Sequence, residues 1–159
     1  MKHGYTLVEI LVGITIIGLL FSFGFVSFRD FSRRQALAGA VKSVQGDLRL
    51  AQELALAGQK PADCGLRILD NYGFRRVSST GYQIEAGCSD VSGPMNVVVK
   101  TVTLAGGAEI SAPSPNPVSF KALGHGTNID VGMSATLTLT QTGAGNPVTL
   151  TITAGGEIK

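Results

Sequence analysis

Near its start this chain carries an uncharged apolar run that is long enough to cross a bilayer. The run extends from Ile10 to Phe28 and covers 19 residues. About 20 consecutive apolar residues span the hydrocarbon core as a helix, so the run predicts one membrane helix. A single acid, Glu9, stands directly before it. A carboxylate at bilayer depth costs about 2.5–3.5 kcal/mol to insert, and we therefore expect Glu9 to meet a cation.

A cleaved secretory signal is the first alternative for such a run. Signal peptides have a shorter apolar segment that ends in a small-residue cleavage site. Here the run continues into "FRDFSRRQALAG" without a clean A-x-A site, which favours a retained helix. Charge counting favours a cytoplasmic head, because more basic residues follow the run than precede it. The residues counted are Lys2 before the run and Arg29, Arg33 and Arg34 after it.

The helical pattern continues beyond the apolar run. Apolar residues recur at spacings of three and four on one stripe, namely Val41, Val44, Leu48, Ala51 and Ala55. The charged residues expected off this stripe are Asp47, Arg49 and Glu53. Gly58 and Pro61 then supply a stop signal. We expect one helix from about Thr6 to Ala57, roughly 75–80 Å long.

The rest of the chain, residues 62–159, has the composition of strands and turns. Strands are expected at residues 82–86, 96–104, 118–122, 135–142 and 147–154. The last two form a hairpin around residues 143–147, with inward residues Leu137, Leu139, Val148, Leu150 and Ile152 and with threonines outward. The predicted fold class is α+β: a long N-terminal helix covers one face of the sheet in an all-β head.

The first residues also match a processing signal. In "MKHGYTLVEILVGITIIGLL" a short basic leader ends in glycine and is followed by an aromatic residue, Thr-Leu-Val-Glu and a long apolar helix. This resembles the cleavage and methylation signal of type IV prepilins and type II secretion pseudopilins. The resemblance implies that a prepilin peptidase cuts after Gly4 and N-methylates Tyr5, which stands where the family more often has Phe. The blocks "VSFKALGHGTN" and "ITAGGEIK" resemble the GspH/FimT branch of minor pilins and pseudopilins.

The resemblance also gives Glu9 a role. It becomes the fifth residue of the mature chain, one helical turn from the free amine of Tyr5, and in the family this glutamate pairs with a neighbouring subunit's N-terminal ammonium. The alternative is that Glu9 is an incidental acid that is tolerated near the lipid headgroups. The implied divisions are a leader at 1–4, a transmembrane or filament-core helix at 5–28, an amphipathic stem at 29–58 and a β-rich head at 59–159.

The implied function is that of a structural subunit of a type IV pilus or a type II secretion-like filament, and the sequence leaves these two open. Against the charge count, the resemblance implies a single-pass inner-membrane protein with its head outside the cytoplasm, which then joins a periplasmic or cell-surface filament. The implied partners are the prepilin peptidase, other pilin or pseudopilin subunits through the N-terminal helix, the inner-membrane assembly platform, and membrane lipid before assembly.

A head displayed at the filament tip, as an adhesin or for DNA uptake, is the alternative function. The cations available for DNA are Arg75, Arg76, Lys100 and Lys121. Scattered cations in a chain of net charge +2 are typical of a solvated surface. Some FimT-like proteins bind DNA through a C-terminal G-R-x-R element, whereas residues 155–159 here contain no arginine.

The two cysteines, Cys64 and Cys88, lie 24 positions apart. In an exported domain they predict one disulfide that stabilises by about 3 kcal/mol, and two separate buried thiols are the alternative. His125 is the only histidine left after the implied cleavage, because His3 lies in the leader. With no catalytic or metal-binding constellation, we expect neither an enzyme nor a cofactor.

Overall fold

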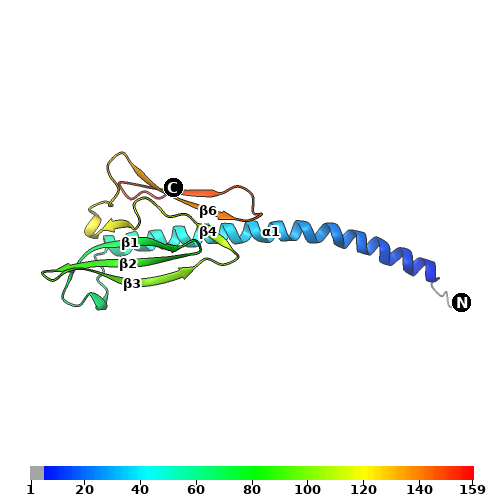
Figure 1. The fold of residues 1–159 in the computed structure, drawn as a ribbon, viewed down its shortest axis with the longest axis horizontal. Coiled ribbons are helices and arrows are strands. Elements are labelled where there is room, and N and C mark those ends of the chain that lie inside the picture. The colour runs from blue at the N-terminus through cyan, green and yellow to red at the C-terminus, as the bar shows by residue number, and fades with distance from the viewer. Residues whose placement is uncertain (1–5) are drawn as a thin grey trace.

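A computed structural model of the protein describes residues 6–159, apart from the side chains of residues 22–27. Over these residues one long helix, α1 (Leu7–Leu56), leads into a β-rich head (Figure 1). The N-terminal half of α1 extends away from the head, and its C-terminal half lies against the strands. The predicted long helix and α+β class are therefore confirmed.

The helix ends where the glycine stop signal predicts. Gly58 has a φ of +61°, a left-handed conformation that glycine adopts without steric cost. Its N–H donates to the carbonyl of Ala55, and the N–H of Gln59 donates to the carbonyl of Leu54, both at 3.1 Å. These two bonds form a Schellman motif, which satisfies the last carbonyls of the helix.

Two antiparallel sheets make up the head. The first has the order β3-β2-β1-β5, with bounds β1 (Ile68–Ser78), β2 (Gly81–Asp90), β3 (Gly93–Thr103) and β5 (Val118–Lys121). The second has the order β4-β6-β7, with bounds β4 (Ala108–Ile110), β6 (Ser134–Gln141) and β7 (Val148–Thr153). Two short 3-10 turns, η1 (Ala62–Cys64) and η2 (Ala122–Gly124), lie in the connections.

The five predicted strands overlap β2, β3, β5, β6 and β7, and four of them run one residue past an end of the observed strand, whereas β1 and β4 were not predicted. The sequence of β1 contains turn-forming and charged residues, such as Asn71, Gly73 and Arg76, which disfavour a strand locally. Pairing on both sides overrides that preference, because β2 and β5 flank β1 and bury Tyr72 and Phe74. β4 has only three residues, too few to show an alternation.

The hairpin of β6 and β7 follows the predicted alternation except at one position. Four of the predicted inward side chains are buried: Leu137, Leu139, Leu150 and Ile152. Val148 was expected inside and is 37% exposed, so that prediction is wrong. Val148 is the first residue of β7, beside the connecting loop. Alternation identifies the face of a strand but not the point at which the core ends.

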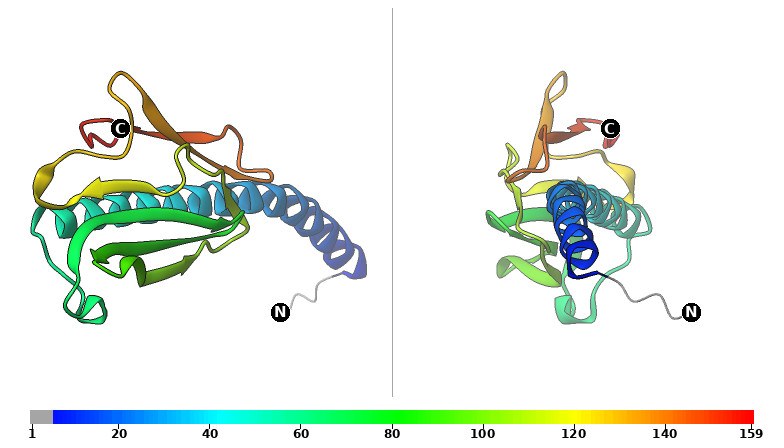
Figure 2. Two further views of the ribbon diagram at one scale, coloured as in Figure 1. Left: turned by 60° about the vertical axis from the view of Figure 1, so that its left-hand side comes forward. Right: turned by 90° about the vertical axis from the view of Figure 1, so that its right-hand side faces the viewer.

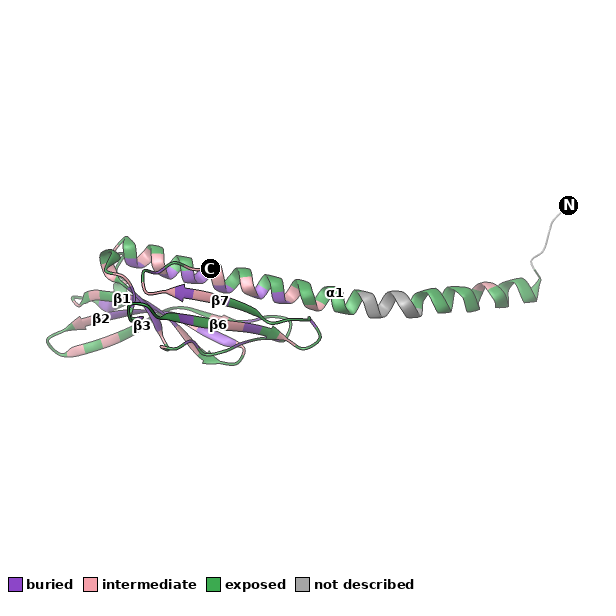
Figure 3. Ribbon diagram, turned by 90° about the horizontal axis from the view of Figure 1, so that it is seen from above, coloured by how far each residue is buried: buried purple, intermediate pink, exposed green. Residues whose placement is uncertain are grey.

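The C-terminal half of α1 contacts both sheets, not one. It packs on β1 and β5 of the first sheet and on β4 and β6 of the second. Figure 2 shows this half of the helix between the two layers, and Figure 3 shows its buried residues facing the strands. Val44, Leu48, Ala51 and Ala55 from the predicted stripe are buried, together with Leu37. One helical stripe therefore serves as the shared core of the head.

A disulfide joins Cys64 in η1 to Cys88 in β2, with Cα atoms 6.0 Å apart. Both residues are fully buried. The predicted pairing is confirmed, and the alternative of two separate thiols is wrong. The bond attaches the segment that follows α1 to the first sheet.

We expect the double variant Cys64→Ala/Cys88→Ala to lower the free energy of unfolding by about 3 kcal/mol, because the unfolded chain loses a 24-residue closure. Urea denaturation of the full chain in detergent, followed by circular dichroism, measures the change. Dithiothreitol should destabilise the wild type and leave the double variant unaffected. Equal unfolding midpoints for the two proteins would contradict the prediction.

Candidate functional site

The N-terminal half of α1 presents an apolar surface that the head does not cover. Thirteen large apolar side chains between Leu7 and Phe31 are exposed among those described, and Leu7 and Phe21 are 80% and 75% exposed. Within the described residues, no helix combines the length and apolarity that a bilayer crossing requires. Exposed apolar area of this extent marks a surface that another apolar phase or another protein covers.

Glu9 caps the start of this helix. The Thr6 backbone N–H donates to Glu9 Oε2 at 3.2 Å, and the Glu9 N–H donates to Thr6 Oγ1 at 3.3 Å. This reciprocal pair is a capping box, and the negative charge also lies at the positive end of the helix dipole. The carboxylate nevertheless remains exposed. It is thus oriented by Thr6 of its own chain, and its exposed side is accessible to a cation.

This cap was not predicted from the sequence, although the sequence carries its signal, Thr-x-x-Glu before an apolar run. The predicted cleavage and methylation residues, Gly4 and Tyr5, lie outside the described residues. So does the leader, residues 1–4. The predicted meeting of Glu9 with an N-terminal ammonium therefore stays a prediction.

A second polar site joins the stem to the head. Asp47 was expected off the apolar stripe and is instead buried, so that expectation is wrong. Its Oδ2 accepts a hydrogen bond from the Tyr82 hydroxyl at 2.8 Å, and its Oδ1 lies 2.6 Å from Lys100 Nζ. Position 47 is three residues after Val44 and four before Ala51, which places it on the stripe that faces the sheet.

The buried tyrosines on this face are held protonated. Burial raises the pKa of Tyr82, and its hydrogen bond to the Asp47 carboxylate raises it further, against an opposing effect of Ser43. Burial also raises the pKa of Tyr72, whose hydroxyl donates to the carbonyl of Gln59 at 2.6 Å. A protonated hydroxyl can donate a hydrogen bond, so the Tyr82–Asp47 bond and the Tyr72–Gln59 bond both persist through neutral pH.

The head's cations are largely engaged by protein groups. Arg75 makes a forked contact with the buried Glu85, with Nη2–Oε1 at 2.8 Å and Nε–Oε2 at 2.9 Å. The hydrogen bond to Glu85 raises the pKa of Arg75. Arg76 Nε donates to the carbonyl of Ile110, and Lys100 pairs with Asp47. Three of the four candidate DNA-binding cations, Arg75, Arg76 and Lys100, therefore already contact groups of the protein itself.

His125 is exposed beside η2, at an open hollow of about 360 Å³ that Lys121 and Asp130 also line. Among the described residues, no group of three or more His, Cys, Asp or Glu side chains could hold a metal ion. The described residues thus offer two features: the exposed apolar helix with its capped acid Glu9, and the joint between stem and head formed by Asp47, Tyr82 and Lys100.

Comparison with family models decides the family. The model of the prokaryotic N-terminal methylation motif matches residues 1–25, and the model of type II transport protein GspH matches residues 40–156. The second match covers more than half of the chain. The chain belongs to the GspH family. No curated protein and no solved structure matches it.

Membership in the GspH family makes this chain a minor pseudopilin of the type II secretion system, a structural and non-enzymatic subunit. It resolves the choice between pilus and secretion pseudopilus that the sequence left open. The methylation motif implies processing by the prepilin peptidase, anchoring in the inner membrane through the N-terminal helix, and assembly with other pseudopilins. The GspH match begins within the stem half of α1 and extends through the head.

We expect Asp47→Ala to lower the free energy of unfolding of this GspH-family protein by about 2–3 kcal/mol. The substitution removes the carboxylate that accepts from the buried Tyr82 hydroxyl and leaves only Ser43 Oγ at 3.3 Å as its partner; bonds to charged groups contribute about 1.5–3 kcal/mol. Lys100 adds little, since its side chain is 45% exposed. Urea denaturation measures the loss.

Glu53→Ala is the matched control, because Glu53 is an exposed acid on the same helix. It should change the free energy of unfolding by less than about 0.5 kcal/mol. An Asp47→Ala variant as stable as this control would show that the joint contributes nothing.

Proposed function

We propose that this GspH-family pseudopilin is cut between Gly4 and Tyr5, methylated on Tyr5, and carried into the secretion pseudopilus by α1. The observation that carries the proposal is the unbroken helix from Leu7 to Leu56, which joins the methylation motif to the GspH head. Its exposed apolar half supports a role in lipid before assembly and in a helical core afterwards.

In this proposal Glu9 accepts the ammonium group of a neighbouring subunit's Tyr5. The capping box holds the carboxylate at the first turn of the helix, and the group is exposed. An ion pair in an apolar helical bundle is strong because little water screens it. Each incoming subunit would gain this pair at one axial position, which sets the register of the filament.

We also propose that the head lies outside the cytoplasm, with an inner-membrane platform adding subunits to a periplasmic filament. The Cys64–Cys88 disulfide supports this orientation, because disulfides persist in oxidising compartments. The arginines after the apolar run argue for the opposite orientation. We give more weight to the disulfide, since prepilin-type processing and the family role both need an exported head.

Display of the head as an adhesin or DNA-binding tip remains the alternative. Three of its four candidate cations already have protein partners, and Arg75 and Lys100 are paired with acids. Phosphate binding would have to break these pairs. No described feature favours this function over the structural one.

Mass spectrometry of the N-terminus, on protein taken from its native membrane, tests the processing. We expect a chain that begins at Tyr5 and carries one added methyl group. Protein from a strain without prepilin peptidase should instead retain residues 1–4. A mature chain that begins at Met1, or beyond Phe28, would overturn the proposed function.

Glu9→Gln separates the two roles of this residue. Glutamine can still accept the Thr6 N–H and complete a capping box, but it cannot pair with an ammonium. We expect Glu9→Gln to be inserted and cut normally and to enter pseudopili at least about tenfold less, as for the loss of 1.4 kcal/mol or more. Immunoblotting of sheared filaments measures incorporation.

Glu109→Gln is the control, since Glu109 is an exposed acid of the head. It should assemble like the wild type. Wild-type incorporation of Glu9→Gln would contradict the ion-pair role and leave only the cap.

A further inference from the structure

Two arginines continue the head-facing stripe of α1 toward the apolar run. Arg33 stands four residues before Leu37, a buried residue of that stripe, and Arg29 stands four residues earlier still. Residues four apart lie on the same face of a helix. The face that is apolar inside the head is therefore basic in the short interval between the head and Phe28, where the apolar run ends.

Two loops of the head reach the helix at this level. Gly143, in the connection between β6 and β7, lies against Arg33, and a Cβ on it would stand 3.1 Å from Arg33 Cζ. Gly106, in the connection between β3 and β4, lies against Ala36, three residues further along the helix. Figure 1 shows both connections at the end of the head from which the apolar half of α1 emerges. Residues 104–107 and 142–147 are called the proximal loops below.

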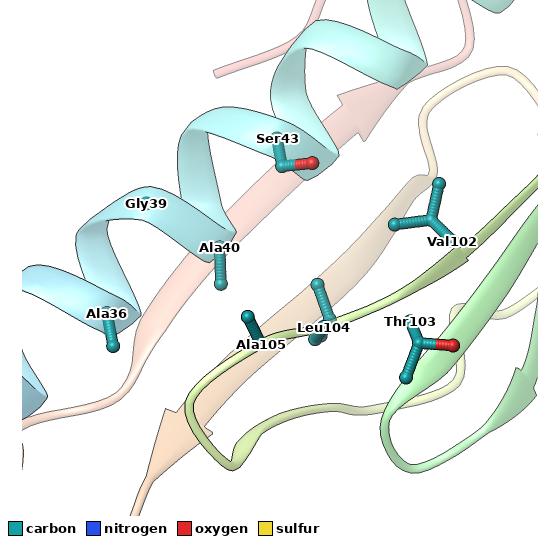
Figure 4. A pocket seen from close by; sticks show the side chains of 8 residues that line it. All are labelled: Ala36, Gly39, Ala40, Ser43, Val102, Thr103, Leu104 and Ala105. Carbon is teal, nitrogen blue, oxygen red and sulfur yellow. The ribbon is translucent and has the colours of Figure 1, made fainter.

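The proximal loops are uncharged. Their sequences are LAGG and TGAGNP, so these loops place no acid beside the arginines. The hollow between α1 and residues 102–105 begins at Ala36, and no charged side chain lines it either (Figure 4). Glycine and alanine predominate in both loops, so few side chains would keep a flat surface away from the backbone.

Arg33 and Arg34 differ from the arginines of the head in their partners. Arg67 and Arg75 each pair with an acid. Within the described part of the chain, no ion pair or hydrogen bond engages the guanidinium group of Arg33 or Arg34. Residues 29–34 contain three arginines and one aspartate, a net charge of +2. This side of the head therefore has cationic charge that the chain itself does not neutralise.

Helix geometry places these arginines at the depth of lipid phosphates. Anchoring through α1 puts the apolar run, which ends at Phe28, in the hydrocarbon core. At about 1.5 Å per residue, Arg33 lies about 7.5 Å beyond Phe28 along the helix axis. The headgroup layer on each side of a bilayer is about 5–7.5 Å thick. The guanidinium groups and the proximal loops therefore meet the headgroups once α1 is inserted.

We propose that the proximal end of the head is a docking surface for anionic phospholipids, an inference that rests on the anchoring of α1 in the membrane before assembly. The lipid phosphates lie against Arg33 and Arg34, and the uncharged proximal loops lie on the headgroups beside them. The planar fork of donors in a guanidinium group suits a phosphate. The docked head is held at the bilayer surface, and it is released when α1 leaves the membrane for the filament.

Hydrogen exchange of the full-length protein in lipid nanodiscs tests the surface without an added probe. One set of nanodiscs contains phosphatidylcholine alone, and the other contains equal amounts of phosphatidylcholine and phosphatidylglycerol. We expect phosphatidylglycerol to slow the exchange of residues 142–146 by about fivefold or more, since each basic residue near an anionic surface strengthens association about fivefold. Exchange of the β2–β3 turn at Val91 and Ser92, at the opposite end of the head, should not change.

Variants separate the charge of the arginines from their packing. Arg33→Gln/Arg34→Gln should abolish the protection by phosphatidylglycerol, whereas Arg33→Lys/Arg34→Lys should retain most of it. Arg49→Gln is the matched control, because Arg49 is an exposed arginine of the same helix, about 22 Å beyond Arg34, and it should keep the full protection. Raising the ionic strength from about 0.15 M to about 1 M shortens the Debye length from about 8 Å to about 3 Å and should weaken the wild-type protection.

Three results would overturn the docking surface. Equal exchange of residues 142–146 in both kinds of nanodisc would show that the loops do not meet anionic lipid. If Arg33→Gln/Arg34→Gln accelerated exchange by the same factor in both, Arg33 would only hold the loop in place. If inorganic phosphate protected the loop equally well in phosphatidylcholine nanodiscs, the site would be one for the free ion.

These results leave the proposed function untouched, because cleavage at Gly4 and the pairing of Glu9 are measured separately by mass spectrometry and filament incorporation. A full-length chain that did not insert into nanodiscs of either composition would instead overturn the anchoring through α1, and with it the proposed function. The two failures are therefore distinguishable.

Discussion

The architecture depends on burying one stripe of a single continuous helix. Along its C-terminal half, α1 gives Val44, Leu48, Ala51 and Ala55 to both sheets at once. Burial of a large aliphatic side chain contributes about 1.5–3 kcal/mol, and neither sheet has another helix to cover it in the described chain. Because the helix does not break between its two halves, the head also fixes the direction in which the exposed apolar half projects.

Three acidic residues differ in how their negative charge is balanced. Asp47 and Glu85 are buried, and each has a cation within 3 Å, Lys100 and Arg75 respectively. The Asp47–Lys100 pair joins the stem helix to β3, and the Arg75–Glu85 pair joins β1 to β2. Glu9 differs, since its described partners are the groups of its own cap, and a cap satisfies hydrogen bonds without neutralising charge. That residual charge beside an apolar helix is what makes assembly through Glu9 physically reasonable.

The rigid joint also shapes the surface beside it. The Asp47–Lys100 pair ties the helix to β3, and Gly106, in the loop after β3, lies close to Ala36 of the helix. Small helical residues between these two points leave a hollow of about 310 Å³ between the helix and residues 102–105.

Local sequence determined the helix and its stop, the processing signal, the hairpin of β6 and β7, and the pairing of Cys64 with Cys88. The helix and the hairpin follow from hydrophobic periodicity, the helix stop from a glycine, and the processing signal from a short motif. The disulfide follows from the expected export of the head. Tertiary structure alone decided that β1 is a strand, that a second sheet forms, and that Asp47 is buried. Those outcomes depend on partners far along the chain: β5 beside β1, and Lys100 opposite Asp47. A local pattern carries no information on such partners, because pairing energy appears only when distant segments meet.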